Sequence, residues 1–196
     1  MSKKAIKTMA AFIAGGLTMS KKVLILSGSP RKGGNSDFLC DAFMKGAQEA
    51  GHDVEKIFIN DKKISYCRAC YVCRHTHKCF QKDDMTEILD KMIESDVLVL
   101  ASPVYFYAIA GQVKTMLDRT LPRWTELKNK EFYYILTAAE DSEAIMQRSL
   151  ECFRGFADCF AGIEEKGVIL AHGLYEKGEA INSPYEQQAY EIGKNV

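Results

Sequence analysis

Four cysteines stand close together in the sequence and are the residues best suited to redox or metal chemistry. They lie within thirteen residues, at Cys67, Cys70, Cys73 and Cys79. Four neighbouring thiolates would repel one another unless a metal or a disulfide neutralised them. Three thiolates separated by two residues can wrap one face of an iron–sulfur cubane, and a fourth from the following turn can close it.

Zinc, or thiols that are free or form disulfides, are the alternatives to an iron–sulfur cluster. Structural zinc loops usually separate two Cys-x2-Cys pairs by a dozen residues or more, unlike this spacing, although His75 and His77 offer further ligands. The other cysteines, Cys40, Cys152 and Cys159, are scattered through helix-like segments and suit small buried positions. A tight cluster, unlike a spread disulfide framework, favours a cytoplasmic location.

A second chemical segment is the glycine-rich stretch from Gly28 to Ser36, with the sequence GSPRKGGNS. Between a strand and a helix, such a turn brings backbone N–H groups and the positive end of the helix dipole to an anion. A P-loop does not fit, because Gly33 is followed by Gly34 and not by Lys, and no Gly-x-Gly-x-x-Gly dinucleotide fingerprint occurs. We expect a bound monophosphate; a tight turn with no ligand is the alternative.

Aromatic residues follow the third expected strand, at Tyr105, Phe106 and Tyr107. At the carboxyl end of a strand they suit a flat, partly apolar ring whose polar edge contacts backbone amides. Filling of the core or of a subunit interface is the alternative. The fourth expected strand runs into a third loop at the same edge, residues 137–140 (TAAE), whose own signal is weak.

The elements that position these loops follow from the hydrophobic periodicity. Apolar runs predict strands at 23–29, 52–60, 96–103, 131–137 and 166–172. Helical spacing predicts helices at 35–50, 84–95, 111–120, 142–160 and from Pro184 onward, with Gly51 and Ser183 as caps. This alternation predicts an α/β fold, a doubly wound five-stranded parallel sheet of order 2-1-3-4-5. In that order the cysteine loop emerges beside the phosphate loop, so we expect residues 67–80 next to the bound ring.

The net charge and the hydropathy of the chain argue against two classes of protein, nucleic-acid-binding proteins and membrane-spanning proteins. The 196 residues carry 26 basic and 26 acidic side chains, so a net charge of zero gives no reason to expect nucleic-acid binding. No apolar stretch approaches the roughly 20 residues that cross a membrane. We expect residues 1–20 to be an N-terminal extension and 21–196 one domain, because MSKK occurs at Met1 and again at Met19, which favours Met19 as the natural start. A secretory signal is the alternative, without a convincing cleavage site.

Several segments resemble a known family. The stretches VLILSGSPRKGGNS, CRACYVCRHTHKCFQKDDM, ASPVYFYAIAGQVKTMLDR and AYEIGKN are similar to the NADPH-dependent FMN reductase-like branch of flavodoxin-like proteins, and more specifically to the iron–sulfur flavoproteins of anaerobes. The resemblance covers residues 21–196. It implies a flavodoxin-like fold, FMN as cofactor, NAD(P)H as co-substrate, a homodimer or homotetramer, and a [4Fe–4S] cluster on the four cysteines.

The resemblance also implies site residues. FMN phosphate contacts are implied for Ser29, Arg31, Asn35 and Ser36. The isoalloxazine ring is implied to lie among Pro103, Val104, Tyr105 and Phe106, with Thr137 and Ala138 on its other side. Family members often carry a glycine in the third loop, and Ala139 and Glu140 depart from that pattern.

We therefore expect an FMN-dependent oxidoreductase that passes electrons from NAD(P)H to a flavin or another acceptor. The second hypothesis is an iron–sulfur flavoprotein that carries electrons received from ferredoxin, because a cluster is useful for splitting electron pairs. The third is a thiol- or metal-based redox sensor. No Ser-His-Asp or Cys-His arrangement stands out, so no catalytic acid or base is assigned.

Overall fold

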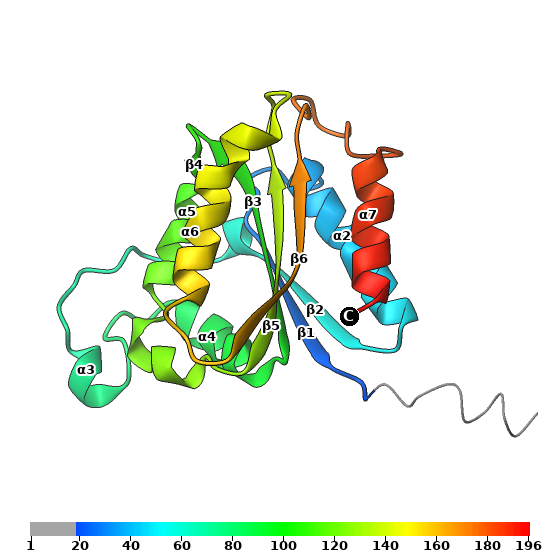
Figure 1. The fold of residues 1–196 in the computed structure, drawn as a ribbon. Helices are drawn as coiled ribbons and strands as arrows, with labels where there is room; N and C mark the ends of the chain where they lie inside the picture. The colour runs from blue at the N-terminus through cyan, green and yellow to red at the C-terminus, as the bar shows by residue number, and fades with distance from the viewer. Residues whose placement is uncertain (1–18) are drawn as a thin grey trace, which may run out of the picture.

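Five parallel strands form the centre of the computed structural model, which describes residues 19–196 (Figure 1). They are β1 (Lys22–Ser27), β2 (Asp53–Phe58), β3 (Val97–Tyr105), β5 (Lys130–Thr137) and β6 (Ile163–Ala171), in the spatial order β2-β1-β3-β5-β6. Counted along the chain as parallel strands, this order is 2-1-3-4-5. The predicted doubly wound parallel sheet is therefore confirmed. A short strand, β4 (Ala108–Ile109), pairs antiparallel with the end of β3 and was not expected.

Helices cover both faces of the sheet. On one face lie α2 (Asn35–Glu49) and α7 (Pro184–Lys194), and on the other lie α4 (Met85–Glu94), α5 (Gly111–Asp118) and α6 (Gln147–Ala157). Because side chains alternate along a strand, Leu98 and Leu100 pack under α4 and α5, while Val97 and Val99 pack under α2. Burial on both faces explains why β3 begins as a continuous apolar run.

The two helices on the α2 face touch along glycines. A Cβ on Gly193 of α7 would lie 2.1 Å from the carbonyl oxygen of Phe43, and a Cβ on Gly46 of α2 would lie 2.1 Å from that of Tyr190. Only glycine allows the two backbones to approach so closely. This contact fixes α7 against α2, the helix that follows the phosphate loop.

Some predicted boundaries are wrong. The helix expected at 142–160 is a short 3-10 helix, η3 (Glu143–Met146), followed by α6, and the last strand begins at Ile163 and not at residue 166. Ser183 does precede α7, but its hydroxyl donates to the carbonyl of Ala180 and caps no helical N–H. Gly51 follows α2 with φ +93°, as a helix-ending glycine should.

The predicted N-terminal extension lies, except for residues 19 and 20, outside the described residues. Within residues 19–196, none of the helices has the length and apolar content needed to cross a membrane.

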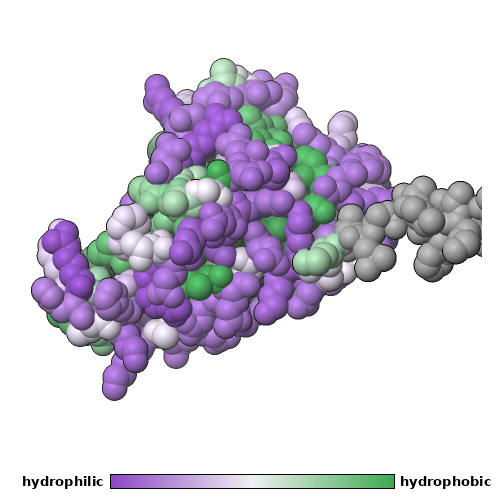
Figure 2. All heavy atoms as spheres, turned by 60° about the horizontal axis from the view of Figure 1, so that its bottom comes forward, coloured by the Kyte–Doolittle hydropathy of each residue, from purple (hydrophilic) through white to green (hydrophobic). Residues whose placement is uncertain are grey.

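The segment between β2 and α4 leaves the body of the domain. It starts with η1 (Ile59–Asp61), contains the one-turn helix α3 (Cys73–Thr76), and reaches α3 at the lower left of Figure 1, against η2 (Leu121–Glu126). Figure 2 shows this lobe protruding at the left, with polar and apolar residues mixed on its surface. Its exposed apolar side chains include Tyr66, Tyr71, Val72 and Phe80.

Candidate FMN site and cysteine pocket

The loop between β1 and α2 is held tightly against the sheet. The N–H of Gly28 donates to the carbonyl of Ala101 at 2.9 Å, and a Cβ at residue 28 would lie 2.0 Å from Val113 Cγ2, so only glycine fits. Further along, Ser29 Oγ accepts from the N–H of Arg31 (3.1 Å) and donates to its carbonyl (3.0 Å). The loop is thus preorganised for a ligand that enters at the carboxyl ends of the strands.

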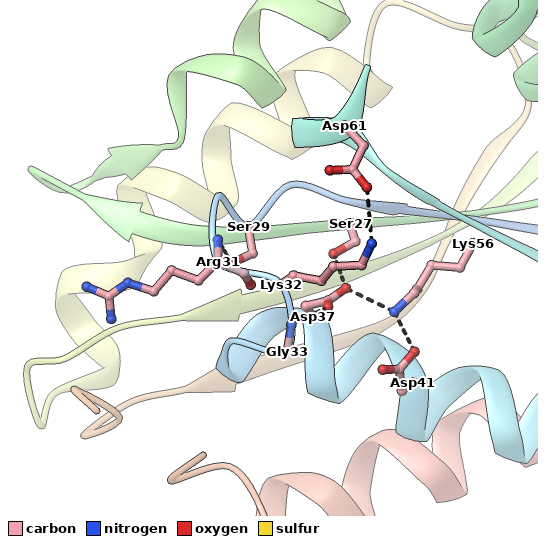
Figure 3. Close-up of polar contacts among 9 residues, drawn as sticks. All are labelled: Ser27, Ser29, Arg31, Lys32, Gly33, Asp37, Asp41, Lys56 and Asp61. Atoms are coloured by element: carbon pink, nitrogen blue, oxygen red, sulfur yellow. Dashed lines mark hydrogen bonds and ion pairs between the residues drawn. The ribbon is translucent and has the colours of Figure 1, made fainter. Parts of the chain in front are cut away.

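A buried carboxylate supports this loop from below (Figure 3). Asp37 accepts hydrogen bonds from Ser27 Oγ (2.7 Å), the N–H of Gly33 (2.8 Å) and Lys56 Nζ (3.0 Å). Burial works to raise the pKa of Asp37, but these bonds outweigh it and hold the pKa below its usual value. Lys56 also pairs with Asp41, and despite burial its pKa is raised by the two carboxylates. This network could not be predicted from the sequence, because its members lie on three elements, β1, α2 and β2, and on the loop between β1 and α2.

A groove opens above the loop, at the carboxyl ends of β1, β3 and β5. It is lined by Ser29, Arg31, Gly34, Asn35, Ser36, Pro103, Val104, Tyr105, Thr137, Ala139, Leu174, Tyr175 and Lys177. Ser36, which is 1 % exposed, lines this groove, and its buried hydroxyl has no hydrogen-bond partner among the described residues. A buried hydroxyl normally has a partner, so an anion in the groove would satisfy it. One end of the groove therefore fits a phosphate, and the walls of Pro103, Val104 and Tyr105 fit a flat ring.

Eight of the ten residues implied for the FMN contacts line this groove, and two do not. Phe106 stands fully exposed at the tip of the β3–β4 hairpin, outside the groove. Ala138 is 4 % exposed, packs in the core on the α6 side, and donates its N–H to the carbonyl of Ala171. The next residue, Ala139, lines the groove in its place. The two alanines are chemically identical, so only the position at which β5 ends decides which one faces the ligand.

Asn35 lines the groove, but its side chain forms hydrogen bonds with backbone groups of the segment between β6 and α7. Its amide nitrogen donates to the carbonyls of Leu174 (3.4 Å) and Glu176 (2.8 Å), and its amide oxygen accepts from the N–H groups of Gly178 (3.1 Å) and Ala180 (3.2 Å). Three groove residues from this β6–α7 segment, Leu174, Tyr175 and Lys177, were missed from the sequence. Their only sequence signal is that they follow a strand that ends at the same edge of the sheet.

All four clustered cysteines line a single pocket. Its wall includes Cys67, Cys70, Cys73 and Cys79 together with Arg119, Leu121 and Pro122. All seven cysteines of the chain are free thiols in the described residues, and no three His, Cys, Asp or Glu side chains within residues 19–196 are arranged as a ready metal site. Burial raises the pKa of the Cys73 thiol, and the other three cysteines raise it further by their charge.

The expectation that residues 67–80 lie next to the bound ring is wrong for the groove of the same chain. The cysteine pocket and the groove share no lining residue, and α3 lies at the lower left of Figure 1, far from the loop between β1 and α2 in the upper half. The strand order does bring the start of this segment to the sheet edge. The segment is long enough, however, to run along the α4 side, where a buried ion pair holds it.

That ion pair joins Arg119 to Asp83. The Arg119 guanidinium, 2 % exposed, makes two hydrogen bonds to Asp83 (2.7 and 2.9 Å) and a third to the carbonyl of Ser65. Its Nε is buried, has no hydrogen-bond partner among the described residues, and belongs to a side chain that lines the cysteine pocket. Burial opposes the charge, but Asp83 and then Cys79 raise the pKa of Arg119. A fixed positive charge thus stands beside the thiols.

The family model of the NADPH-dependent FMN reductases matches residues 21–151. The chain belongs to this family. Membership supports FMN as the cofactor of this chain. The fold agrees: the chain superposes on an azoreductase from Bacillus anthracis with a TM-score of 0.71 at 16 % identity, covering 91 % of this chain and all of the other.

Two relatives carry the name iron–sulfur flavoprotein. One, from Archaeoglobus fulgidus, is 45 % identical over 101 residues, which are 52 % of this chain and 46 % of the relative. The other, from Methanocaldococcus jannaschii, is 41 % identical over 101 residues, 52 % of each protein. The chain therefore matches about half the length of each of these members of the family. 

Proposed function

We propose that this protein takes electrons from NAD(P)H onto FMN bound in the groove and delivers them to a flavin or another acceptor. The observation that carries this proposal is the buried Ser36 hydroxyl, which lacks a partner among the described residues and lies at one end of a groove whose other end has an aromatic wall. Phosphate at one end and a ring at the other are the two parts that FMN presents.

The residues of the groove suit each part of FMN. The phosphate would be held by Ser36, by the charge of Arg31 and by the backbone N–H groups of the turn. The ring would lie against Pro103, Val104 and Tyr105, opposite Thr137 and Ala139. FMN itself supplies acceptance of a hydride and release of one or two electrons. The protein binds it, orients it and limits access of water.

A nicotinamide would approach the ring from solvent. Tyr105 and Tyr175, which line the groove, are both exposed, so this side of the ring site stays open. Within residues 19–196 the structure contains one doubly wound sheet and no second one to hold a dinucleotide. The nicotinamide must therefore stack on the flavin itself, and it would displace whatever covers the ring.

The cysteine pocket favours a second candidate, an iron–sulfur flavoprotein that receives electrons from ferredoxin. Four thiols line one pocket beside a buried arginine, so the four sulfur ligands of a [4Fe–4S] cluster would come from Cys67, Cys70, Cys73 and Cys79 once these side chains converge, with a positive charge nearby. Residues 62–82 carry six Lys or Arg and no Asp or Glu, so this lobe would attract an acidic electron-transfer protein.

We further propose that the chain assembles as a homodimer or homotetramer. The two sites lie apart within one chain, so direct electron transfer between a cluster and FMN would need the groove of a second copy near the cysteine lobe. A cytoplasmic location is proposed as well, because seven free cysteines suit a reducing compartment.

Anaerobic purification followed by spectroscopy tests these functions. We expect flavin absorption that NADPH bleaches, and FMN rather than FAD released on denaturation. The variant with Arg31→Ala and Ser36→Ala should lose roughly 2–3 kcal/mol of FMN binding but little riboflavin binding, because riboflavin lacks the phosphate. Flavin that ferredoxin reduces while NAD(P)H does not would favour the second candidate. A protein that cannot be filled with FMN would contradict both.

A further inference from the structure

The segment between β6 and α7 is fastened across the mouth of the FMN groove. The N–H of Leu174 donates to the carbonyl of Ala138 at 2.9 Å, and the N–H of Gly173 donates to that of Glu140 at 3.1 Å. The Asn35 side chain then takes up four backbone groups between residues 174 and 180. The amide nitrogen of Asn35 donates two of these hydrogen bonds and its amide oxygen accepts the other two, so the segment is fixed to the first residue of α2.

Asn35 therefore has little left to offer a phosphate. A primary amide has two N–H donors, and here both are directed at carbonyl oxygens, those of Leu174 and Glu176. The Asn35 side chain holds the 174–180 segment by hydrogen bonds, and this segment contains Tyr175 and Lys177, which line the groove. Asn35 is in this respect a positioning residue.

Lys177 is the part of this segment with the chemistry to bind an anion. It lines the groove together with Arg31 and Ser36, and its Cε and Nζ would each lie 3.5 Å from a Cβ on Gly33 of the phosphate loop. No carboxylate among residues 19–196 pairs with it, whereas Lys32 of the same loop pairs with Asp61 at 3.2 Å. Figure 3 shows Arg31 and Lys32 pointing to opposite sides of the loop, so Lys32 faces away from the groove.

We propose that Lys177 is a second phosphate-binding cation, which lies beside the phosphate loop and binds the FMN phosphate in the groove, and that Asn35 holds it there. This assignment rests on FMN binding in the groove and is independent of which donor or acceptor the protein uses. It replaces a direct contact between Asn35 and the phosphate with an indirect one through the 174–180 segment.

The test compares FMN and riboflavin affinities of the full-length apoprotein by quenching of flavin fluorescence, without NAD(P)H. Lys177→Ala should weaken FMN about tenfold and riboflavin less than about twofold, since a charged hydrogen bond to the phosphate is lost. Lys32→Ala is the matched control, and we expect less than about a twofold change for either ligand because its charge faces away and is already paired. Equal effects of the two lysine variants on FMN would overturn the role of Lys177.

A double-variant cycle tests Asn35. Asn35→Ala should lower the preference for FMN over riboflavin and accelerate amide hydrogen exchange in residues 174–180. Adding Lys177→Ala to it should then change that preference less than about twofold, because the lysine is already displaced. If the two changes add fully and exchange stays slow, Asn35 contacts the phosphate itself and its positioning role is overturned.

The same measurements separate this proposal from the proposed function. Wild-type protein that prefers FMN over riboflavin but is not reduced by NAD(P)H would contradict the nicotinamide part of the function and leave the Lys177 assignment intact. Wild-type protein that binds both flavins equally would overturn the assignment whatever the donor.

Discussion

Lys56 Nζ lies 3.0 Å from Asp37 Oδ1, and this contact joins β2 to the first turn of α2 directly beneath the phosphate loop. The same carboxylate holds the N–H of Gly33, so the pair sets the shape of a loop that it does not itself belong to. The loop backbone would keep a phosphate bound above the loop apart from the Asp37 carboxylate below it. Lys56 balances the charge of the carboxylate.

Asp37→Asn should lower the free energy of unfolding by about 2 kcal/mol, because the side chain is 4 % exposed and loses its charge-assisted bond to Lys56. Its folded-state pKa lies below the unfolded value of 3.8, so its contribution is full above that pH and disappears as pH falls through the folded-state pKa. The difference between wild type and variant in urea unfolding should therefore stay constant from about pH 7 to about pH 5 and shrink as the pH falls below about 4. The exposed Asp41→Asn should cost under about 1 kcal/mol and serves as control.

The helix contact between α2 and α7 predicts opposite effects for two glycines. Gly193→Ala forces a Cβ to within 2.1 Å of the Phe43 carbonyl and should cost about 2–3 kcal/mol through a backbone shift. Gly155→Ala, in α6, meets nothing within 4 Å and should stabilise the protein by about 0.5–1 kcal/mol. Urea denaturation measures both. Similar values for the two variants would contradict the close approach of α2 and α7.

Asp83→Asn should loosen the cysteine lobe. The change leaves the Arg119 guanidinium buried without its countercharge, and breaking such a pair costs about 3–5 kcal/mol. Hydrogen exchange should rise across residues 63–84 before it rises in β3. Arg123→Gln is the control: its ion pairs with Asp90 and Glu126 are partly exposed, and their loss should cost under about 1 kcal/mol and leave exchange in the lobe unchanged.

The iron content of the protein should depend on the four pocket cysteines and not on the exposed cysteines outside the pocket. In anaerobic protein we expect iron and sulfide with broad visible absorption, and single Ala substitutions at Cys67, Cys70, Cys73 or Cys79 should abolish it. Ser substitutions at Cys152 and Cys159, which are exposed on and just after α6, should leave it unchanged. Iron content that survives all four Ala changes would exclude this pocket as the ligand set.

The β3–β4 hairpin turns through Phe106 and Tyr107, both with left-handed backbone angles (φ 49° and 60°). Asn-Gly is the pair that this turn type prefers, so Phe106→Asn with Tyr107→Gly should raise the free energy of unfolding by about 1 kcal/mol. Bulky residues kept in a strained turn indicate a function, and Phe106 is fully exposed. We expect the double variant to bind FMN normally but to self-associate more weakly in sedimentation. Unchanged assembly would remove these aromatics from the subunit interface.

The strands and helices could be predicted because the side of each element that is buried carries apolar residues at a regular spacing in the sequence. Leu98 and Val99 belong to a run with both faces covered, and the apolar stripe of α4 marks its one buried side. The turn between β1 and α2 could be located because only a few residue types permit such a turn.

Contacts between distant segments could not be predicted, since they leave no period in the sequence. Nothing near Asn35 indicates that it binds residues 174–180, more than 135 positions away. The pair of Arg119 and Asp83 likewise joins an ordinary helix end to an ordinary loop, yet it decides where the cysteines lie. The residues that line the groove were therefore predictable where they follow β1, β3 and β5, and not in the segment between β6 and α7.

The cysteine lobe leaves and re-enters the domain at one point. The N–H of Lys63 donates to Asp84 Oδ2 at 2.7 Å, and the N–H of Asp84 donates to the carbonyl of Lys63 at 3.1 Å. A segment whose two ends touch can be cut out and bridged by a tight turn without moving the strands on either side, provided that Arg119 receives an uncharged replacement. Residues 64–83 thus form an insertion that is closed at its base, whereas the pocket of its cysteines is completed by Arg119, Leu121 and Pro122 of the body of the domain.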